Sequence, residues 1–274
     1  MSATPGRLIV CPTPIGNLED VTLRVLSALR EADVIACEDT RTTKVLLDRY
    51  GVSAPRTRYD ANVEARVAPK LVERMRAGET VALVSDAGMP LVSDPGFVLV
   101  AACVGAGLAV EVLPGPSAAL AAIVASALPA ETWRFVGFLP RKKGELTTAL
   151  RARETLVAFE SPRRVGATLT VLAGLEPERA VAVCRELTKI HEEVVRGTAS
   201  ELAARYSEQE PRGEVVLVIG PTTRPQGGDL DVALAALARL VEAGARARPA
   251  AGVVAELTGT SANALYRALN ASDS

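Results

Sequence analysis

In the first half of the chain, a short apolar run, a loop of small or acidic residues and a helical pattern follow one another four times. The runs are Arg7–Cys11, Val34–Cys37, Val81–Val84 and Val110–Leu113. This alternation predicts parallel strands joined by crossover helices, because parallel neighbours need a connection that returns along the sheet. We therefore expect an α/β fold whose N-terminal sheet is mostly parallel and covered by helices on both faces.

Composition agrees with such layers and limits the modes of binding. Apolar residues make up 49% of the chain and aromatic residues only 3%, so the core must consist of Val, Leu and Ala, and base stacking is scarce. The net charge is -1, with 31 Lys and Arg against 32 Asp and Glu. This balance argues against a protein that wraps naked nucleic acid by charge alone, and we expect no DNA partner.

The cysteines lie far apart and form no CxxC pair. Cys11, Cys37 and Cys103 stand within apolar runs, which predicts buried thiols in a reducing compartment and no metal site. The sequence shows no secretory leader and no apolar stretch of about 18 residues. These features predict a soluble cytoplasmic protein without a membrane partner.

The rhythm changes at Trp133. Two strand candidates are adjacent around Thr188–Glu192 without a helix between them, which predicts an antiparallel hairpin in a mixed sheet. We expect an N-terminal α/β domain over 1–130, a C-terminal α/β domain over 131–222, and a linker with a helical tail over 223–274. The segment Pro221–Asp229 has the composition of a linker. The pattern of the tail predicts short helices. These would either pack on the two α/β domains as a cap or contact nucleic acid in the manner of a helix-turn-helix.

Charged residues recur where apolar runs end, at the positions where α/β proteins hold ligands. They are Glu38, Asp39, Arg41, Asp86, Glu160, Arg163, Arg164, Arg185, Glu186 and Lys189. The alternative is that they cap helices or form surface pairs, as Asp39 before Thr40 would at a helix start. Neither GxGxxG nor GxxxxGK[ST] is present, which disfavours an NAD or ATP protein. The sole histidine, His191, is either solvent-facing or a catalytic base.

An ordered set of motifs resembles the tetrapyrrole-methylase superfamily and, within it, the ribosomal RNA small-subunit methyltransferase I branch. The motifs are PTPIGNLEDVTLR, EDTR, VSDAGMPLVSDPG, PGPSA, GFLPRK, ESPRR, RELTK and RGEVVLVIG. The resemblance implies two α/β domains, a homodimer, S-adenosylmethionine as methyl donor, and 2′-O-methylation of a cytidine in the 16S RNA of the small ribosomal subunit. Two departures stand out. Met89 replaces a small hydroxyl residue, and Asn62 alone remains of a motif that commonly carries histidine.

The resemblance also implies site residues. The cofactor contacts would be Pro12, Asp86, Gly88, Met89, Val92, Ser117, Ala118, Glu160, Leu187, Glu214 and Val215. A carboxylate, or a lysine with a shifted pKa, could take the proton of the ribose hydroxyl, and the candidate residues are Asp39, Asp86 and Glu186. RNA contacts would come from Arg41, Asn62, Arg141, Lys142, Arg163 and Arg164. Two other functions remain open, namely a tetrapyrrole methyltransferase and a non-catalytic ribosome-assembly factor.

Overall fold

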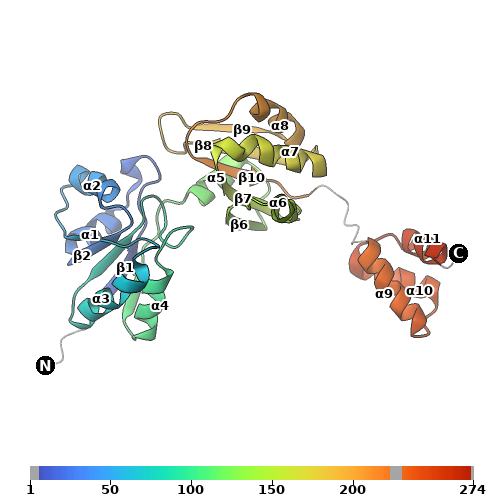
Figure 1. Cartoon of the computed structure of the whole chain (residues 1–274), viewed down its shortest axis with the longest axis horizontal. Helices are drawn as coiled ribbons and strands as arrows, with labels where there is room; N and C mark the ends of the chain where they lie inside the picture. Colours follow the sequence, from blue (N-terminus) through green and yellow to red (C-terminus); the bar gives the residue numbers. More distant parts are fainter. Residues whose placement is uncertain (1–5, 223–229, 273–274) are drawn as a thin grey trace. The chain divides into compact units, whose positions relative to one another are not determined.

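The structure, a computed structural model, describes residues 6–222 and 230–272 (Figure 1). The chain divides into two compact units at Thr222. The first unit contains both sheets, and the second contains three helices. The expected domain boundaries at 130 and 222 remain predictions.

The first sheet has five parallel strands in the order β3-β2-β4-β1-β5. These are β1 (Arg7–Cys11), β2 (Val34–Cys37), β3 (Arg56–Arg58), β4 (Val81–Val84) and β5 (Ala109–Val112). The parallel sheet expected from the sequence is confirmed. Strand β3 was not anticipated, because it has three residues, two of them exposed arginines, and no apolar run.

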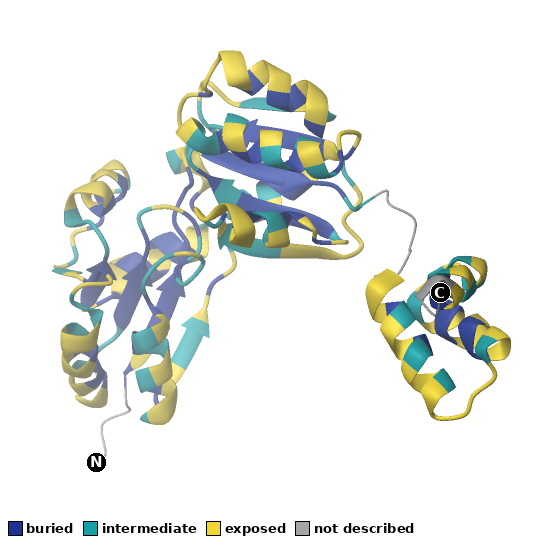
Figure 2. Cartoon of the chain, turned by 45° about the vertical axis from the view of Figure 1, so that its right-hand side comes forward, coloured by how far each residue is buried: buried dark blue, intermediate teal, exposed yellow. Residues whose placement is uncertain are grey.

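Helices cover both faces of this sheet. The helices are α1 (Leu23–Glu31) and α2 (Thr40–Arg49) on one face and α3 (Glu64–Arg76) and α4 (Phe97–Gly105) on the other. Strand residues alternate between the two cores: Ile9 packs on the side of α1, and Val10 on the side of α3. Figure 2 shows the resulting pattern, with buried central strands and exposed outer helix faces. Because the strands are parallel, each of the four crossover connections begins with a loop at the carboxyl edge of the sheet.

The second sheet is mixed, in the order β6-β7-β10-β8-β9. Its strands are β6 (Trp133–Phe138), β7 (Thr155–Glu160), β8 (Ala180–Arg185), β9 (Glu193–Thr198) and β10 (Val215–Ile219). Strands β6 and β7 are parallel and the other pairs antiparallel, and β8 and β9 form the predicted hairpin.

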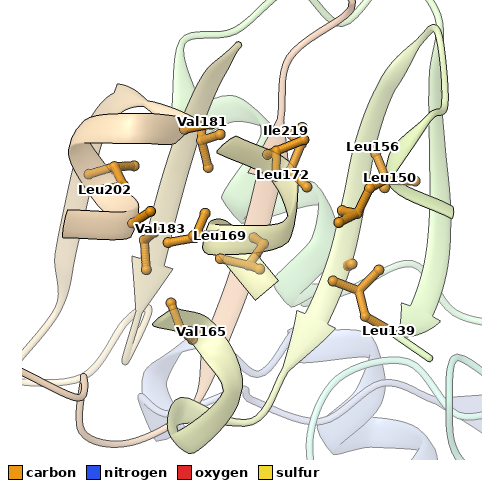
Figure 3. Close-up of a cluster of buried hydrophobic side chains, with 14 of the residues drawn as sticks. Leu139, Leu150, Leu156, Val165, Leu169, Leu172, Val181, Val183, Leu202 and Ile219 are labelled. Atoms are coloured by element: carbon orange, nitrogen blue, oxygen red, sulfur yellow. The ribbon is translucent and has the colours of Figure 1, made fainter. Parts of the chain in front are cut away.

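One face of the second sheet carries α6 (Lys143–Leu150), α7 (Val165–Leu175) and α8 (Ala199–Glu208). Their aliphatic core includes Leu156, Leu169 and Leu202 (Figure 3). The opposite face is covered by α5 (Ala118–Ser126), through Ala122 and Ile123. Helix α5 thus precedes β6 in sequence but packs on the second sheet, which brings its N-terminus to the loops of both sheets.

The second unit has a core of its own. Its helices are α9 (Leu230–Glu242), α10 (Ala247–Thr258) and α11 (Ala262–Ser272), as the sequence predicted. Leu237, Val254 and Leu265 are buried among them. Most of the predicted linker, residues 223–229, lies outside the described residues. No helix within 6–222 or 230–272 combines the length and the apolar character needed to cross a bilayer.

Candidate active site

Two loops at the edge of the first sheet are tied to each other. The backbone N–H groups of Thr13 and Gly88 each donate to the carbonyl of the other residue, at 2.9 Å. The Thr13 hydroxyl donates to the carbonyl of Ser85 at 3.0 Å, and the Ser85 hydroxyl donates to that of Gly88 at 3.0 Å. The segment from Ser85 to Gly88 is therefore a fixed wall.

This wall borders a cavity of about 310 Å³, which lies within the size range of small-molecule sites. The cavity also receives the start of α5 and the ends of strands from the second sheet. Of the expected cofactor contacts, its lining includes Gly88, Met89, Val92, Ser117, Ala118, Glu160, Glu214 and Val215. Pro12 is buried outside this lining, Asp86 faces a neighbouring cavity, and Leu187 faces a small adjoining one.

The N-terminus of α5 presents hydrogen-bond donors to the cavity. Ser117 caps this helix, and its hydroxyl accepts a hydrogen bond from the N–H of Leu120 at 3.4 Å. The first N–H groups of a helix have no acceptor within the helix, and the helix dipole favours negative charge there. Ser117 and Ala118 therefore form a site suited to a carboxylate or a hydroxyl of a ligand.

Glu160, at the end of β7, is buried and fully paired. Its carboxylate accepts hydrogen bonds from the Ser161 N–H at 2.8 Å and the Thr168 hydroxyl at 2.7 Å. Arg164 approaches it at 3.3 Å and also donates to the carbonyls of Leu139 and Pro140. Arg164 thus neutralises a buried charge and anchors the loop after β6, so it is less available to RNA than the sequence suggested.

Glu186 joins the ends of β8 and β10. Its carboxylate accepts from the N–H of Glu214 and from Lys189, both at 2.9 Å, and these hydrogen bonds lower the pKa of the carboxyl. Gly213 has φ +84°, and a Cβ on it would lie 2.3 Å from the Glu186 carboxyl carbon. These contacts give Glu186 a positioning role, and its catalytic role stays a prediction.

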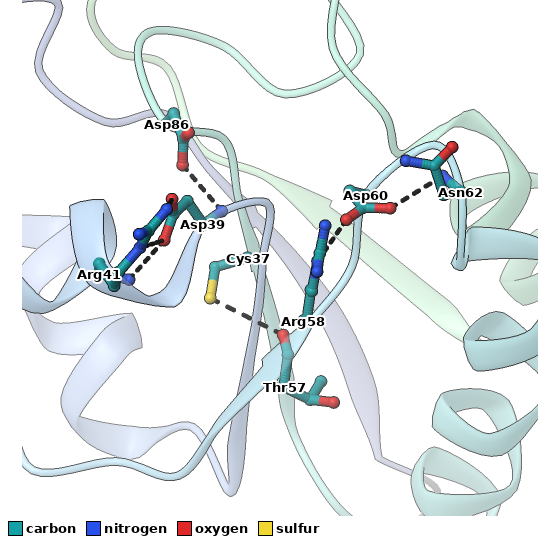
Figure 4. Close-up of polar contacts among 8 residues, drawn as sticks. All are labelled: Cys37, Asp39, Arg41, Thr57, Arg58, Asp60, Asn62 and Asp86. Carbon is teal, nitrogen blue, oxygen red and sulfur yellow. Dashed lines mark hydrogen bonds and ion pairs between the residues drawn. The ribbon is translucent and has the colours of Figure 1, made fainter.

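Asp39 and Asp86 lie together in a second cavity, of about 460 Å³ (Figure 4). Asp39 caps α2, and hydrogen bonds from Arg41 lower the pKa of its carboxyl to about 2. Asp86 accepts a hydrogen bond from the Asp39 N–H, but burial raises its pKa. Glu38 lines the same cavity, and burial followed by the charge of Asp86 raises its pKa. The N-cap alternative for Asp39 is therefore realised.

The sequence analysis missed Asp94, which lines the first cavity. Burial, followed by the charge of Glu38, raises the pKa of the Asp94 carboxyl to about 6; the Ser85 hydroxyl lowers it in part, and Asp86 raises it further. Two non-glycine residues just before it, Leu91 and Ser93, have φ of 72° and 68°. Such backbone is costly for residues with a Cβ and concentrates at functional sites.

Phe138 was also missed. Residues 135 and 138 of a regular strand would face opposite sides, but β6 has a register shift between them, with Gly137 at φ +63°. Both rings therefore contact Phe159 edge to face, at centroid distances of 4.9 and 5.6 Å. Phe138 lines the cavity and is nevertheless 64% exposed. It provides an apolar ring at the mouth of the site.

The remaining predicted RNA contacts divide between two places. Arg141 and Lys142 are exposed in the loop after β6, and Arg163 is exposed after β7. Arg41 and Asn62 line the acidic second cavity instead. His191 is exposed in the hairpin loop and lines a third cavity, of about 610 Å³, but not the first one.

Comparison with known proteins identifies the family. The model of the tetrapyrrole (corrin/porphyrin) methylases matches residues 7–203. The chain belongs to the tetrapyrrole methylase family. The family match covers the first sheet and all strands of the second sheet except β10.

Relatives of this tetrapyrrole methylase share most of its length. Proteins named ribosomal RNA small subunit methyltransferase I are 45% identical in Mesorhizobium japonicum, over 96% of this chain and 90% of the relative, and 40% identical in Escherichia coli O157:H7, over 96% and 94%. The protein of the same name in Bacillus subtilis is 42% identical, over 78% of this chain and 75% of the relative's length.

Solved structures of other methylases share the fold. Cobalt precorrin-4 methyltransferase superposes with a TM-score of 0.58 at 19% identity, over 78% of this chain and 94% of its own. Uroporphyrin-III C-methyltransferase from Thermus thermophilus, complexed with S-adenosylhomocysteine, superposes with a TM-score of 0.56 at 23% identity. The superposition covers 78% of this chain and 97% of that enzyme. At these identities the likeness establishes the shared architecture of the tetrapyrrole methylases.

Proposed function

We propose that this tetrapyrrole methylase transfers a methyl group from S-adenosylmethionine to the 2′-hydroxyl of a cytidine in the 16S RNA of the small ribosomal subunit. The proposal is carried by one juxtaposition: a ligand-sized cavity bordered by both sheets has Phe138 in its lining, and Phe138 directly precedes the loop that exposes Arg141 and Lys142. The names of relatives that are 40–45% identical over 96% of the chain support the RNA substrate.

The residues of the cavity suit the methyl donor. The α5 N-terminus at Ser117 and Ala118 would hold the donor's carboxylate, and Val92, Val215 and Phe159 supply apolar wall. S-adenosylmethionine supplies an electrophilic methyl group on a positively charged sulfonium. Asp94 in this cavity and Asp86 and Glu38 in the next give the edge of the first sheet a negative character that favours a cation.

The protein's main task is then alignment of the hydroxyl with the methyl carbon and exclusion of water. Phe138 offers its exposed ring for stacking of a base, since every base has a π-face. Arg141, Lys142 and Arg163 would contact backbone phosphates. Arg164 would act indirectly, by holding the carbonyls of Leu139 and Pro140 at the base of the basic loop.

We further propose a cytoplasmic homodimer. The edge strand β5 exposes Val112, while α4 exposes Phe97 and Val104 and α5 exposes Val124. Exposed apolar side chains around an uncovered sheet edge favour association with another protein surface. A second copy of this chain is the occupant consistent with the resemblance to dimeric family members.

A tetrapyrrole substrate is the second candidate, supported by the fold shared with corrin and porphyrin methylases. The third, a non-catalytic assembly factor, would bind subunits without transfer. The test uses radiolabelled S-adenosylmethionine and small subunits from cells that lack this gene, followed by mapping of the modified nucleotide. Label on one cytidine ribose supports the proposal. Label on a tetrapyrrole, or subunit binding without transfer, supports the second or third candidate.

A further inference from the structure

Three carboxylates line the first cavity, and two of them form ion pairs. Glu160 is paired with Arg164, and Glu214 is paired with Lys189 at 2.9 Å. Within residues 6–222 and 230–272, no ion pair joins the third, Asp94, to a lysine, arginine or histidine. Asp94 is therefore the cavity carboxylate whose negative charge has no protein counter-ion there.

The backbone holds Asp94 in place. The loop from Met89 to Gly96 passes through left-handed conformations at Leu91, Ser93 and Gly96. A Cβ on Gly96 would lie 2.6 Å from Leu91 Cδ1, and one on Gly137 would lie 3.1 Å from Ser93 Oγ. The residues flanking Asp94 are thus closely packed against the first sheet's core and against the bulge of β6, and Asp94 lines the same cavity as Phe138.

The groups facing Asp94 favour proton uptake. Burial disfavours the ionised form of Asp94, and so do the negative charges of Glu38 after β2 and Asp86 after β4. A hydrogen bond from the Ser85 hydroxyl favours the ionised form and offsets part of this effect. A proton acceptor works best when its pKa lies near the operating pH. By contrast, Arg41 holds Asp39 ionised far below neutrality, and Glu186 is occupied by Glu214 and Lys189.

We propose that Asp94 is the catalytic residue that accepts the proton of the attacking hydroxyl, an inference that rests on the proposed function. As the bond between the hydroxyl oxygen and the methyl carbon forms, the bond between that carbon and the sulfonium sulfur breaks, and its electron pair stays on sulfur. The hydroxyl proton passes to the Asp94 carboxylate and later to water. One negative and one positive charge are consumed together, so the step is balanced.

The test compares wild-type protein with D94N and D94E, and uses D48N as the matched control, because Asp48 is an exposed residue of α2 paired with Lys44. Single-turnover methylation of small subunits at saturating donor is followed from about pH 5 to about pH 8. We expect D94N to lose at least about 100-fold in rate together with the acid limb of the pH profile. D94E should recover part of the rate, and D48N should match wild type.

Two further readouts are independent of turnover. In a carbon NMR titration of the donor-free protein, one aspartate carboxyl signal should titrate near pH 6 in wild type and be absent in D94N. Calorimetry should show at most about a tenfold loss of donor affinity in D94N, well below its loss of rate, because Asp94 supplies only part of the negative charge near the donor. If D94N keeps the wild-type rate and pH profile, or loses donor affinity as much as it loses rate, the catalytic role of Asp94 is overturned. The proposed function would then still stand. A wild-type protein that transfers no methyl group to subunits refutes the proposed function and this proposal with it.

Discussion

The Asp86 carboxylate accepts a hydrogen bond of 3.0 Å from the backbone N–H of Asp39, which joins the loop after β4 to the start of α2 (Figure 4). The carboxylates near this contact, those of Asp39, Asp86 and Asp94, differ in their electrostatic surroundings. Arg41 favours the ionised form of Asp39, whereas burial disfavours that of Asp86 and of Asp94. Environment rather than residue type therefore separates their possible roles.

Arg164→Gln should lower the free energy of unfolding by about 3 kcal/mol, because it leaves the buried Glu160 carboxylate without its cation. Arg163→Gln, at the neighbouring exposed position, should change that free energy by less than about 0.5 kcal/mol. Urea unfolding followed by circular dichroism measures both. Equal stability of the two variants would show that the Glu160–Arg164 pair does not hold this loop.

Gly213→Ala should lose both stability and donor affinity, because the new Cβ would overlap the Glu186 carboxyl and the backbone there is left-handed. We expect a cost of about 1–3 kcal/mol for the strain. The matched control is Gly174→Ala in α7, where a Cβ meets nothing within 4 Å. That variant should gain about 0.5–1 kcal/mol as a helix glycine replaced by alanine. A Gly213→Ala protein with wild-type donor affinity would contradict the positioning role of Glu186.

Asp94→Asn should stabilise the protein at neutral pH. The folded-state pKa, about 6, lies above the ordinary value, so the folded form binds the extra proton and the contribution of Asp94 to stability is lost as the pH rises through about 6. Removing the charge should then raise the unfolding free energy at pH 7.5 by on the order of 1 kcal/mol, after allowance for solvent screening of a half-buried group. At pH 4 the two proteins should melt alike. A variant that is less stable than wild type at pH 7.5 would contradict the electrostatic account.

Charge reversal of the basic loop, R141E with K142E, should weaken binding to small ribosomal subunits and reduce the slope of log affinity against log salt by about 2. Donor affinity should stay at the wild-type value, since neither residue lines the first cavity. Filter binding over a salt series, alongside calorimetry of the donor, separates the two effects. An unchanged salt slope would place the phosphate contacts elsewhere.

The sequence predicted the strands that consist of continuous apolar runs. It did not predict strands without such a run, or which sheet a helix packs on. Strand β3 lacks such a run, and α5 follows the first sheet in sequence while its Ala122 and Ile123 pack on the second. The same limit applies to the site. The motif VSDAGMPLVSDPG offers two aspartates, and Asp94, which follows left-handed backbone at Leu91 and Ser93, is the one that lines the first cavity. Phe138 depends likewise on a bulge that no period-2 pattern reveals.

The most direct test of the central claim is methyl transfer itself. Purified full-length protein, radiolabelled S-adenosylmethionine and small subunits from cells lacking the gene should yield label on the ribose of a single 16S cytidine. The labelled position should resist alkaline cleavage, since a methylated 2′-oxygen cannot attack the adjacent phosphate. Label on a base, on several nucleotides or on a tetrapyrrole instead of the RNA would contradict the account.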